Sequence, residues 1–334
     1  MAGTNDMSMN KRAKGVMAAM PSLFDGNGEP DLPMMERLTD WYLGHGVHGL
    51  FVLGSMGLGP ASRIDQRKAI AEAVMRRVQG QVPVILHIGA AEPYTSCELG
   101  EHAQSIGVNA VAIVGPYYYN DRTEWDLIEH FKMVDAATNL PILLYNNRAY
   151  SGYPMPPEFI AKLRDAVPNL FGMKLADGTI RQAIEYLNVL TSEFVLFIPI
   201  DMMLPGMLIG VKGSTASGVP VTVPEAGVQM VEAIWAKDYE RAQKIQVLML
   251  EHSMRMAPLR KIYGRTTTLE GLRLRGLPVK QYARWPSKPM SAEHLKLYEE
   301  HLKRIVDGVH DLSAPALTAI SDARRHHRRK VFSS

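Results

Sequence analysis

Cysteine is nearly absent from this chain of 334 residues, since Cys97 is the only one. One thiol can form neither an internal disulfide nor a cysteine-cluster metal site. A protein without disulfides fits a reducing compartment, and we expect a cytoplasmic location. Residues 1–14 are polar and lack the apolar core of a secretion signal. We therefore expect residues 1–13 to be a disordered N-terminus.

Long apolar runs and a strong charge excess are also lacking. The longest apolar stretch, residues 194–211, contains Pro199, Asp201 and Pro205, which suits a strand, a turn and a helix better than a membrane helix. The net charge is +3, and removing the five positive charges of residues 324–330 leaves −2. A near-neutral body argues against nucleic-acid binding. We expect the basic tail, residues 311–334, to be a solvated, disordered end rather than a site for an acidic partner.

Short apolar runs recur along the chain and predict buried strands. They are continuous rather than alternating, as a parallel sheet buried on both faces requires. The predicted strands are residues 15–22, 49–54, 82–88, 110–115, 142–145, 171–175, 194–198 and 213–217.

Segments of helical period separate these runs, and Ile70, Val74 and Val78 mark one of them. Successive βα units predict an α/β fold, a (β/α)8 TIM barrel over residues 14–236. An open doubly wound sheet is the alternative. It normally carries a G-x-G-x-x-G motif after an early strand, and Gly54-Ser55-Met56-Gly57-Leu58-Gly59 lacks that spacing. After Asp238 the pattern is purely helical, which predicts a C-terminal helical domain over residues 237–310.

Lys174 is the first candidate for chemistry. It lies in the apolar run 171–175, where desolvation lowers the pKa of an amine. A neutral amine can attack a carbonyl carbon and form a Schiff base. The active site of such a barrel lies at the C-terminal ends of its strands, which would place Ser55 and Tyr145 in the same pocket. A nucleophile, a proton carrier and a relay hydroxyl would then lie together.

Each of these residues also has a simpler structural interpretation. Residues 54–57 could be an ordinary tight turn, and the tyrosines at 117–119 could serve packing or an interface. Tyr145 could cap the barrel core, and Asp201 could only cap the helix that follows it. The combination of positions, rather than any one of them, favours a catalytic site.

The order of these motifs resembles that of the dihydrodipicolinate synthase / N-acetylneuraminate lyase family, from about residue 15 to residue 256. The family's G-[ST]-T-G-E loop resembles residues 54–58, its P-Y-Y segment residues 116–118, and its Y-N-x-P segment residues 145–148. Its G-[IM]-K-[ED]-[AS]-[ST] strand resembles residues 172–177, and the G-S-T of the neuraminate lyase branch is similar to residues 213–215. The resemblance implies a barrel with a helical C-terminal domain, usually in a homotetramer built as a dimer of dimers. It also implies class I (Schiff-base) lyase chemistry on a 2-oxo acid, most often pyruvate.

Carried over by position, the resemblance assigns roles to individual residues. Lys174 is the Schiff-base lysine, Tyr145 the general acid/base and Ser55 the relay hydroxyl. Tyr118 is the tyrosine lent to a neighbouring subunit, although Tyr119 leaves this assignment open by one residue. Substrate contacts are expected from Met56, Gly57, Arg148, Tyr150, Ser214 and Thr215. Neither a metal nor another cofactor is expected, because the iminium at Lys174 supplies the positive charge that a metal would otherwise supply.

Several positions depart from the family pattern. Met56 replaces a threonine that usually helps to hold the substrate carboxylate, and Leu58 replaces the usual glutamate. Arg148 stands where proline is common, and Tyr150 occupies the stretch where dihydrodipicolinate synthases place a substrate-binding arginine. These departures predict a lyase other than a true dihydrodipicolinate synthase. It would catalyse pyruvate-type aldol cleavage or condensation, or dehydration of a 3-deoxy-2-oxo sugar acid. A hydratase-aldolase acting on an aromatic or apolar pyruvate adduct is the alternative.

Two other classes of protein remain as rivals. A catalytically degraded 2-oxo-acid-binding protein would explain Met56 and Leu58, but it has no reason to keep Lys174 in an apolar strand. A metal-dependent barrel aldolase would need a His/Asp/Glu cluster at the strand ends, where only scattered histidines such as His87 are available. We expect a small 2-oxo acid as substrate, and neither nucleic acid nor membrane as partner.

Overall fold

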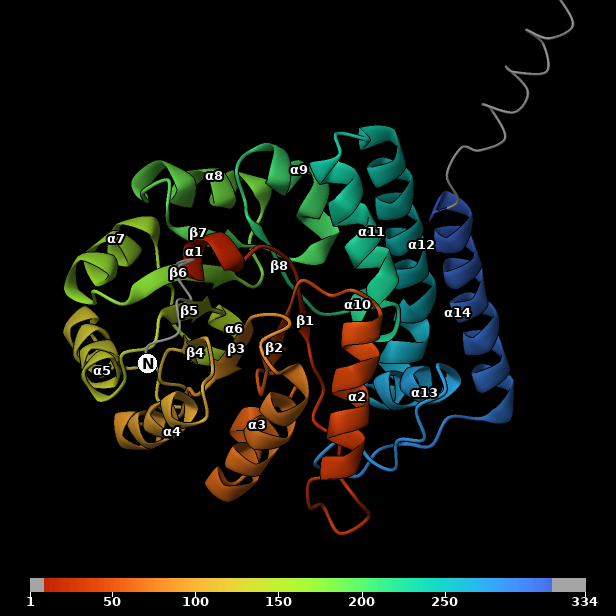
Figure 1. The fold of residues 1–334 in the computed structure, drawn as a ribbon, viewed down its shortest axis with the longest axis horizontal. Coiled ribbons are helices and arrows are strands. Elements are labelled where there is room, and N and C mark those ends of the chain that lie inside the picture. Colours follow the sequence, from red (N-terminus) through yellow and green to blue (C-terminus); the bar gives the residue numbers. More distant parts are fainter. Residues whose placement is uncertain (1–8, 314–334) are drawn as a thin grey trace, which may run out of the picture.

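A computed structural model describes residues 9–313, and its centre is a closed barrel of eight parallel strands in sequential order (Figure 1). All strand residues are buried, as the continuous apolar runs predict. The predicted TIM barrel is therefore confirmed, and each predicted strand overlaps an observed one. The strands are β1 (Gly15–Ala19), β2 (Gly49–Val52), β3 (Val84–His87), β4 (Ala110–Val114), β5 (Ile142–Asn146), β6 (Leu170–Leu175), β7 (Val195–Phe197) and β8 (Gly213–Ala216).

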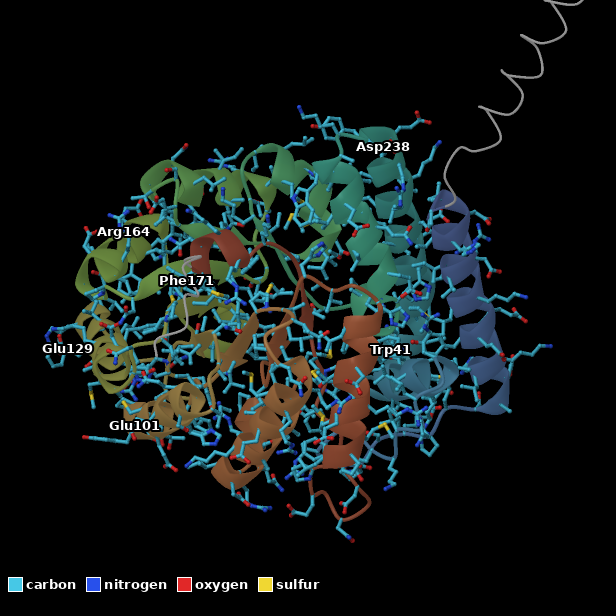
Figure 2. All side chains as sticks on the ribbon, viewed as in Figure 1. Trp41, Glu101, Glu129, Arg164, Phe171 and Asp238 are labelled. Atoms are coloured by element: carbon cyan, nitrogen blue, oxygen red, sulfur yellow. The ribbon has the colours of Figure 1, made fainter. Side chains whose placement is uncertain are left out.

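A ring of helices surrounds the barrel. Figure 2 shows Glu101, Glu129 and Arg164 projecting from the outside of this ring. The ring consists of α2 (Leu32–Gly44), α3 (Ile64–Val78), α4 (Pro93–Ser105), α5 (Glu124–Ala137), α7 (Pro157–Ala166), α8 (Ile180–Val189), α9 (Met203–Leu208) and α11 (Pro224–Trp235). The loops hold the short helices α6 (Arg148–Ser151) and α10 (Val219–Thr222) and the 3₁₀ turns η1 (Gly59–Ala61) and η2 (Ile200–Met202).

Capping boxes fix where two ring helices begin. The Thr123 hydroxyl accepts from the Asp126 N–H at 3.2 Å, and the Asp126 carboxylate accepts from the Thr123 N–H at 2.8 Å. Thr179 and Gln182 repeat this arrangement at the start of α8. Such pairs satisfy backbone donors that the first helical turn leaves free, so these short sequence signals set the helix starts.

The segment before β1 differs from the prediction. We expected disorder up to residue 13, whereas α1 (Met9–Arg12) is helical and contacts β6 at one end of the barrel (Figure 1). Met9 and Ala13, four residues apart, are buried in one apolar cluster with Phe171, which lies beside α1 in Figure 2. Burial of this apolar face stabilises the helix. Residues 1–8 lie outside the described part of the chain.

Two glycines close the barrel. Gly213 on β8 pairs with Gly15 on β1, and a Cβ added at Gly213 would collide with the backbone of Gly15. The last strand can therefore approach the first only where this side chain is missing.

The C-terminal helical domain packs beside α11. It consists of α12 (Tyr239–Tyr263), α13 (Thr266–Leu274) and α14 (Ala292–Ser313), and α12 lies between α11 and α14 (Figure 1). The helix α14 continues past residue 310, where we expected the ordered chain to end, and the basic residues 324–330 lie outside the described residues. No helix between residues 9 and 313 has the length and apolar character needed to cross a membrane.

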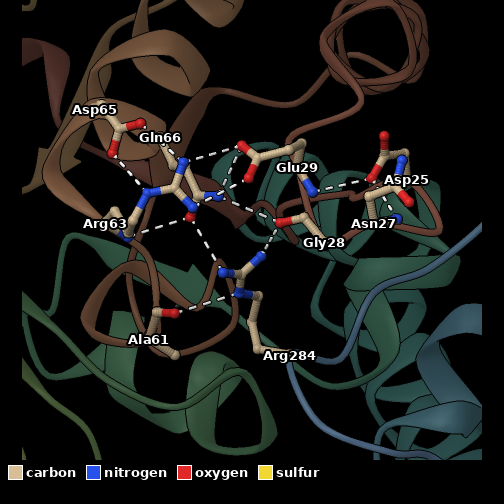
Figure 3. A network of polar contacts seen from close by, with 9 residues as sticks. All are labelled: Asp25, Asn27, Gly28, Glu29, Ala61, Arg63, Asp65, Gln66 and Arg284. Carbon is tan, nitrogen blue, oxygen red and sulfur yellow. Dashed lines mark hydrogen bonds and ion pairs between the residues drawn. The ribbon is translucent and has the colours of Figure 1, made fainter.

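A non-helical crossing segment, residues 275–291, links α13 to α14 and returns to the barrel. Arg284 fastens it by donating to the carbonyl oxygens of Gly28 and Ala61 and to the Gln66 side chain at 3.2 Å (Figure 3). Its guanidinium also stacks on Phe24, 4.5 Å from the ring centre. The crossing segment is thus held against the loops that follow β1 and β2.

Candidate active site

Lys174 and Tyr145 lie side by side near the carboxyl ends of β6 and β5. They are direct partners in the register of the two strands. The Lys174 Nζ lies 4.1 Å from the centre of the Tyr145 ring and 4.9 Å from the centre of the Phe51 ring on β2. The lysine is only 9% exposed. The amine is therefore held between two aromatic rings in the mouth of the barrel.

Burial lowers the pKa of the Lys174 ammonium, and the neighbouring Tyr145 opposes this shift only in part. Desolvation disfavours the charged form, and no aspartate or glutamate within residues 9–313 lines the cavity to offset it. The amine consequently loses its proton more readily than a surface lysine does.

The Tyr145 hydroxyl is the centre of a small hydrogen-bond network. It lies 3.0 Å from the Ser55 hydroxyl, and the Asn147 amide donates to it at 3.2 Å. Burial alone would raise the pKa of Tyr145, but the charge of Lys174 and these hydrogen bonds outweigh burial and lower the pKa. A phenol in this setting can give up and regain a proton beside the amine.

A cavity of about 240 Å³ opens above the lysine, and we call it the lysine cavity. The Thr215 hydroxyl and the side-chain amide oxygen Oδ1 of Asn147 are buried and find no hydrogen-bond partner among the described residues. Buried polar atoms normally have partners, so these two are available to a bound ligand. The cavity is lined by Ala19, Phe51, Gly54, Ser55, Met56, Gly57, Tyr145, Asn147, Tyr150, Lys174, Ala176, Ile198, Pro199, Thr215, Ser217 and Arg265.

A second cavity of about 220 Å³, which we call the aromatic cavity, adjoins the first. The two share Ser55, Tyr145, Tyr150 and Arg265. A ligand can therefore place one end beside Lys174 and the other in the aromatic cavity. The rest of the aromatic cavity is mostly apolar and is lined by Leu58, Pro60, Ala61, His87, Val114, Tyr117 and Trp285.

The C-terminal domain contributes directly to the site. Arg265, just before α13, donates to the Ser55 carbonyl oxygen at 3.3 Å and to the Tyr282 hydroxyl at 2.6 Å. That hydroxyl donates in turn to the Met56 carbonyl oxygen at 2.7 Å. The loop after β2 is therefore held from the crossing segment as well as from the barrel.

Most of the predicted site residues line the lysine cavity. The structure brings together Ser55, Met56, Gly57, Tyr145, Tyr150, Lys174 and Thr215.

Three predicted site residues lie elsewhere. Arg148 is exposed and lines a separate hollow beside α7 and α8. Ser214 is fully buried outside the lysine cavity, because successive residues of β8 point to opposite faces and Thr215 takes the inward one. Tyr118 is 84% exposed with a φ of 79°, and the preceding Tyr117 lines the aromatic cavity instead.

Sequence reasoning missed Phe51, Asn147, Arg265 and Trp285. Phe51 could have been found from its inward position on β2, and Asn147 from its place two residues after Tyr145. Nothing in the local sequence of Arg265 and Trp285 distinguishes them from other residues of a helical appendix.

Potential metal ligands do not gather in the described part of the chain. No group of three His, Cys, Asp or Glu side chains is placed to hold an ion between residues 9 and 313. The buried His87 instead accepts the Val114 N–H through Nε2 at 3.2 Å. Its role here is to join β3 to β4.

The fold and the comparisons with known proteins define a lyase of the class I aldolase type. The model of the dihydrodipicolinate synthetase family matches residues 12–305. The 4-hydroxy-tetrahydrodipicolinate synthase 2 of Halalkalibacterium halodurans is 31% identical over 294 residues, covering 86% of this chain and 98% of the relative. The chain belongs to the dihydrodipicolinate synthetase family.

Solved structures agree with this assignment. A dihydrodipicolinate synthase crystal structure is 29% identical, with a TM-score of 0.76 over 87% of this chain and 98% of the other. The sialic acid aldolase of Ruminococcus gnavus has a TM-score of 0.83 at 24% identity, covering 90% of this chain and 99% of the other. At that identity the second comparison shows the shared fold alone.

Proposed function

We propose that the protein is a Schiff-base lyase that acts on a 2-oxo acid, with Lys174 as the nucleophile. The observation that supports this most is the pairing of a desolvated lysine with Tyr145, whose hydroxyl contacts Ser55 at 3.0 Å. Tyr145 would carry protons, and Ser55 would relay them.

The reaction follows from this arrangement. The neutral amine of Lys174 attacks the C2 ketone, and loss of water gives an iminium. In aldol cleavage, Tyr145 takes the proton of the C4 hydroxyl, the C3–C4 bond breaks, and its electron pair moves into the iminium to give an enamine and an aldehyde. In dehydration, Tyr145 takes a C3 proton to give the enamine, whose electron pair expels the C4 hydroxyl; the hydroxyl takes up that proton and leaves as water, and the iminium is restored. After cleavage the enamine is protonated at C3. On both routes, addition of water to the iminium then releases the product and the amine.

The substrate carboxylate would lie on the loop formed by residues 54–57. The peptide N–H groups of Met56 and Gly57 have no acceptor among the described residues, so they are free to donate to it. Met56 offers no hydroxyl for the same purpose, and Leu58 is a wall of the aromatic cavity. These two replacements support an activity other than dihydrodipicolinate synthesis.

The aromatic cavity supports the hydratase-aldolase alternative for the acceptor half. Its apolar walls beside Tyr145 suit an aromatic or apolar aldehyde better than a polyhydroxylated sugar chain, whose hydroxyls would lose hydrogen bonds to water there.

We also propose that the protein is a homotetramer in which Tyr118 reaches a neighbouring subunit. This is supported by the exposure of Tyr118 and Tyr119, whose rings pack edge to face at 5.0 Å on the loop after β4. Sedimentation velocity of the wild-type protein and a Tyr118→Ala variant would test it. A monomeric wild-type protein would contradict the proposal.

Borohydride trapping tests the chemistry. The protein is incubated with pyruvate and borohydride, and intact mass is measured. We expect one reduced pyruvate adduct per chain, which disappears in Lys174→Ala and persists in Lys212→Ala, a change at an exposed lysine. Absence of an adduct in the wild-type protein, or its survival in Lys174→Ala, would reject the proposal.

A panel of 2-oxo acids distinguishes the remaining alternatives. Release of pyruvate is followed with a coupled assay, and thermal stability is measured with each compound. Turnover supports the lyase, whereas stabilisation without turnover points to a binding protein. Rapid condensation of pyruvate with aspartate semialdehyde would show a true dihydrodipicolinate synthase and contradict the narrower proposal.

A further inference from the structure

A cation without a partner acid lies where the two cavities meet. Arg265 lines both of them, and no carboxylate within residues 9–313 forms an ion pair with it or lines either cavity. Lys174 also lines the lysine cavity and carries a positive charge once its iminium has formed. The combined site therefore has two positive groups, which is one more than a 2-oxo acid with a single carboxylate needs.

The contacts of Arg265 leave part of its guanidinium free. A guanidinium has five N–H donors, and hydrogen bonds to Ser55 and Tyr282 use one on each terminal nitrogen. Trp285 holds the group from the side, 5.4 Å from its central carbon to the ring centre. The arginine is only partly buried, and its remaining donors are available at the junction of the cavities.

The same neighbours make the group rigid. The Tyr282 hydroxyl is anchored on the Met56 carbonyl oxygen, and Arg284 fastens the crossing segment to Gly28 and Ala61 (Figure 3). A pre-positioned arginine loses less conformational freedom on binding an anion than a flexible surface side chain does.

We propose that Arg265 is a specificity-determining residue that binds a carboxylate on the acceptor half of the substrate. The apolar body of that half lies in the aromatic cavity, against Tyr117 and Trp285, while the 2-oxo acid half lies beside Lys174. The inferred substrate class is a pyruvate adduct of a flat, apolar aldehyde that carries its own carboxylate. This inference rests on the proposed function and adds the chemistry of the acceptor.

Matched aldehyde pairs test the inference in the condensation direction. The full-length protein is assayed with pyruvate and each of the three isomeric carboxybenzaldehydes, and in parallel with the three formylbenzamides, which have the same shape but no charge. Charge-assisted hydrogen bonds predict that at least one acid is preferred over its amide by roughly 10- to 100-fold in kcat/KM. Arg265→Met should remove this preference and leave the rates with the amides within a few fold. Arg265→Lys, which keeps the charge, should restore part of it.

Arg255→Met is the matched control. It removes an exposed arginine of the C-terminal domain that lines neither cavity, so it should leave the ratio of the rates with acids and amides unchanged. A purely structural role of Arg265 predicts the same result for Arg265→Met, and that result would overturn the inference. So would a wild-type protein with no preference for any acid, or with no turnover of either series. A higher KM for pyruvate itself, with an unchanged ratio of acids to amides, would place the pyruvate carboxylate on Arg265 and also overturn it.

Pyruvate trapping on Lys174 separates the two claims. An intact adduct together with a lost acid preference rejects only the role of Arg265. Absence of the adduct rejects the proposed function itself.

Discussion

Lys174 should cost the protein stability, and its replacement by methionine measures that cost. Methionine has a similar length and no charge, so it fills the space between Tyr145 and Phe51 without burying an ammonium. In the wild-type protein the two rings attract the cation, an effect of about 0.5–2 kcal/mol. The pKa of Lys174 is nevertheless lowered, so desolvation outweighs this attraction.

The expected gain follows from the cost of burying a donor without a partner, which is about 1–3 kcal/mol and more for a charged group. The attraction of the two rings offsets part of this cost. We expect Lys174→Met to raise the free energy of unfolding by about 1–2 kcal/mol at neutral pH, or the melting temperature by roughly 2–4 °C. Lys212→Met, at an exposed lysine, should stay within about 0.5 kcal/mol of the wild-type value.

The pH dependence of this gain identifies its cause. Below the folded-state pKa of Lys174 the amine is charged in both states, so the gain is full. It shrinks as the pH rises from there toward the unfolded-state pKa of about 10.4, above which both states are neutral. Thermal unfolding of both proteins across this range is the assay. A variant that melts below the wild type, or a gain that is the same at every pH, would refute the desolvation argument.

Three further perturbations follow from the described contacts. Tyr145→Phe removes the proposed proton carrier and should lower kcat roughly 100- to 10,000-fold, and a loss of activity below tenfold would count against this role. Because Tyr145 raises the pKa of Lys174, half-maximal borohydride trapping should also move to lower pH in this variant. Gly213→Ala would force a Cβ into the backbone of Gly15 and should lower the free energy of unfolding in urea by more than about 3 kcal/mol. Gly26→Ala, in open space, should lower it little. Equal effects would contradict the claim that the barrel closes only where Gly213 lacks a side chain. Burial lowers the pKa of His252 to about 4 from 6.5, so the unfolded state binds the proton first and the free energy of unfolding falls as the pH drops from 6.5 to 4. His252→Gln should remove up to about 3 kcal/mol of that fall. An unchanged pH profile of the free energy of unfolding would exclude this residue as its source.

The barrel and the buried position of Lys174 could be predicted because both rest on local patterns. Continuous apolar runs marked every strand, and Lys174 stood out as the one cation in such a run. The residue of β8 that points into the barrel was harder to predict. Ser214 and Thr215 are adjacent hydroxyl residues, and a shift of one residue decides which of them faces the lysine cavity.

The crossing segment could not be predicted for a different reason. Residues 275–291 have no period, and Arg284 holds them through hydrogen bonds to carbonyl groups of residues more than 200 positions earlier. Trp285 lies on this segment, and Arg265 contacts the carbonyl oxygen of Ser55, which is 210 positions earlier. No pattern in the neighbouring sequence records these contacts.

The lysine cavity and the aromatic cavity take walls from parts of the chain that lie far apart in the gene. The codons for β5 and β6 specify the proposed reacting groups, Tyr145 and Lys174, while those for residues 265–285 specify one wall of the aromatic cavity. A mutation or a grafted segment in this late window can reshape that wall without touching Tyr145 or Lys174. A mutant library confined to it would therefore explore new acceptors while every member kept Lys174 and Tyr145. A ribosome reaches this window only after all eight strands have been made.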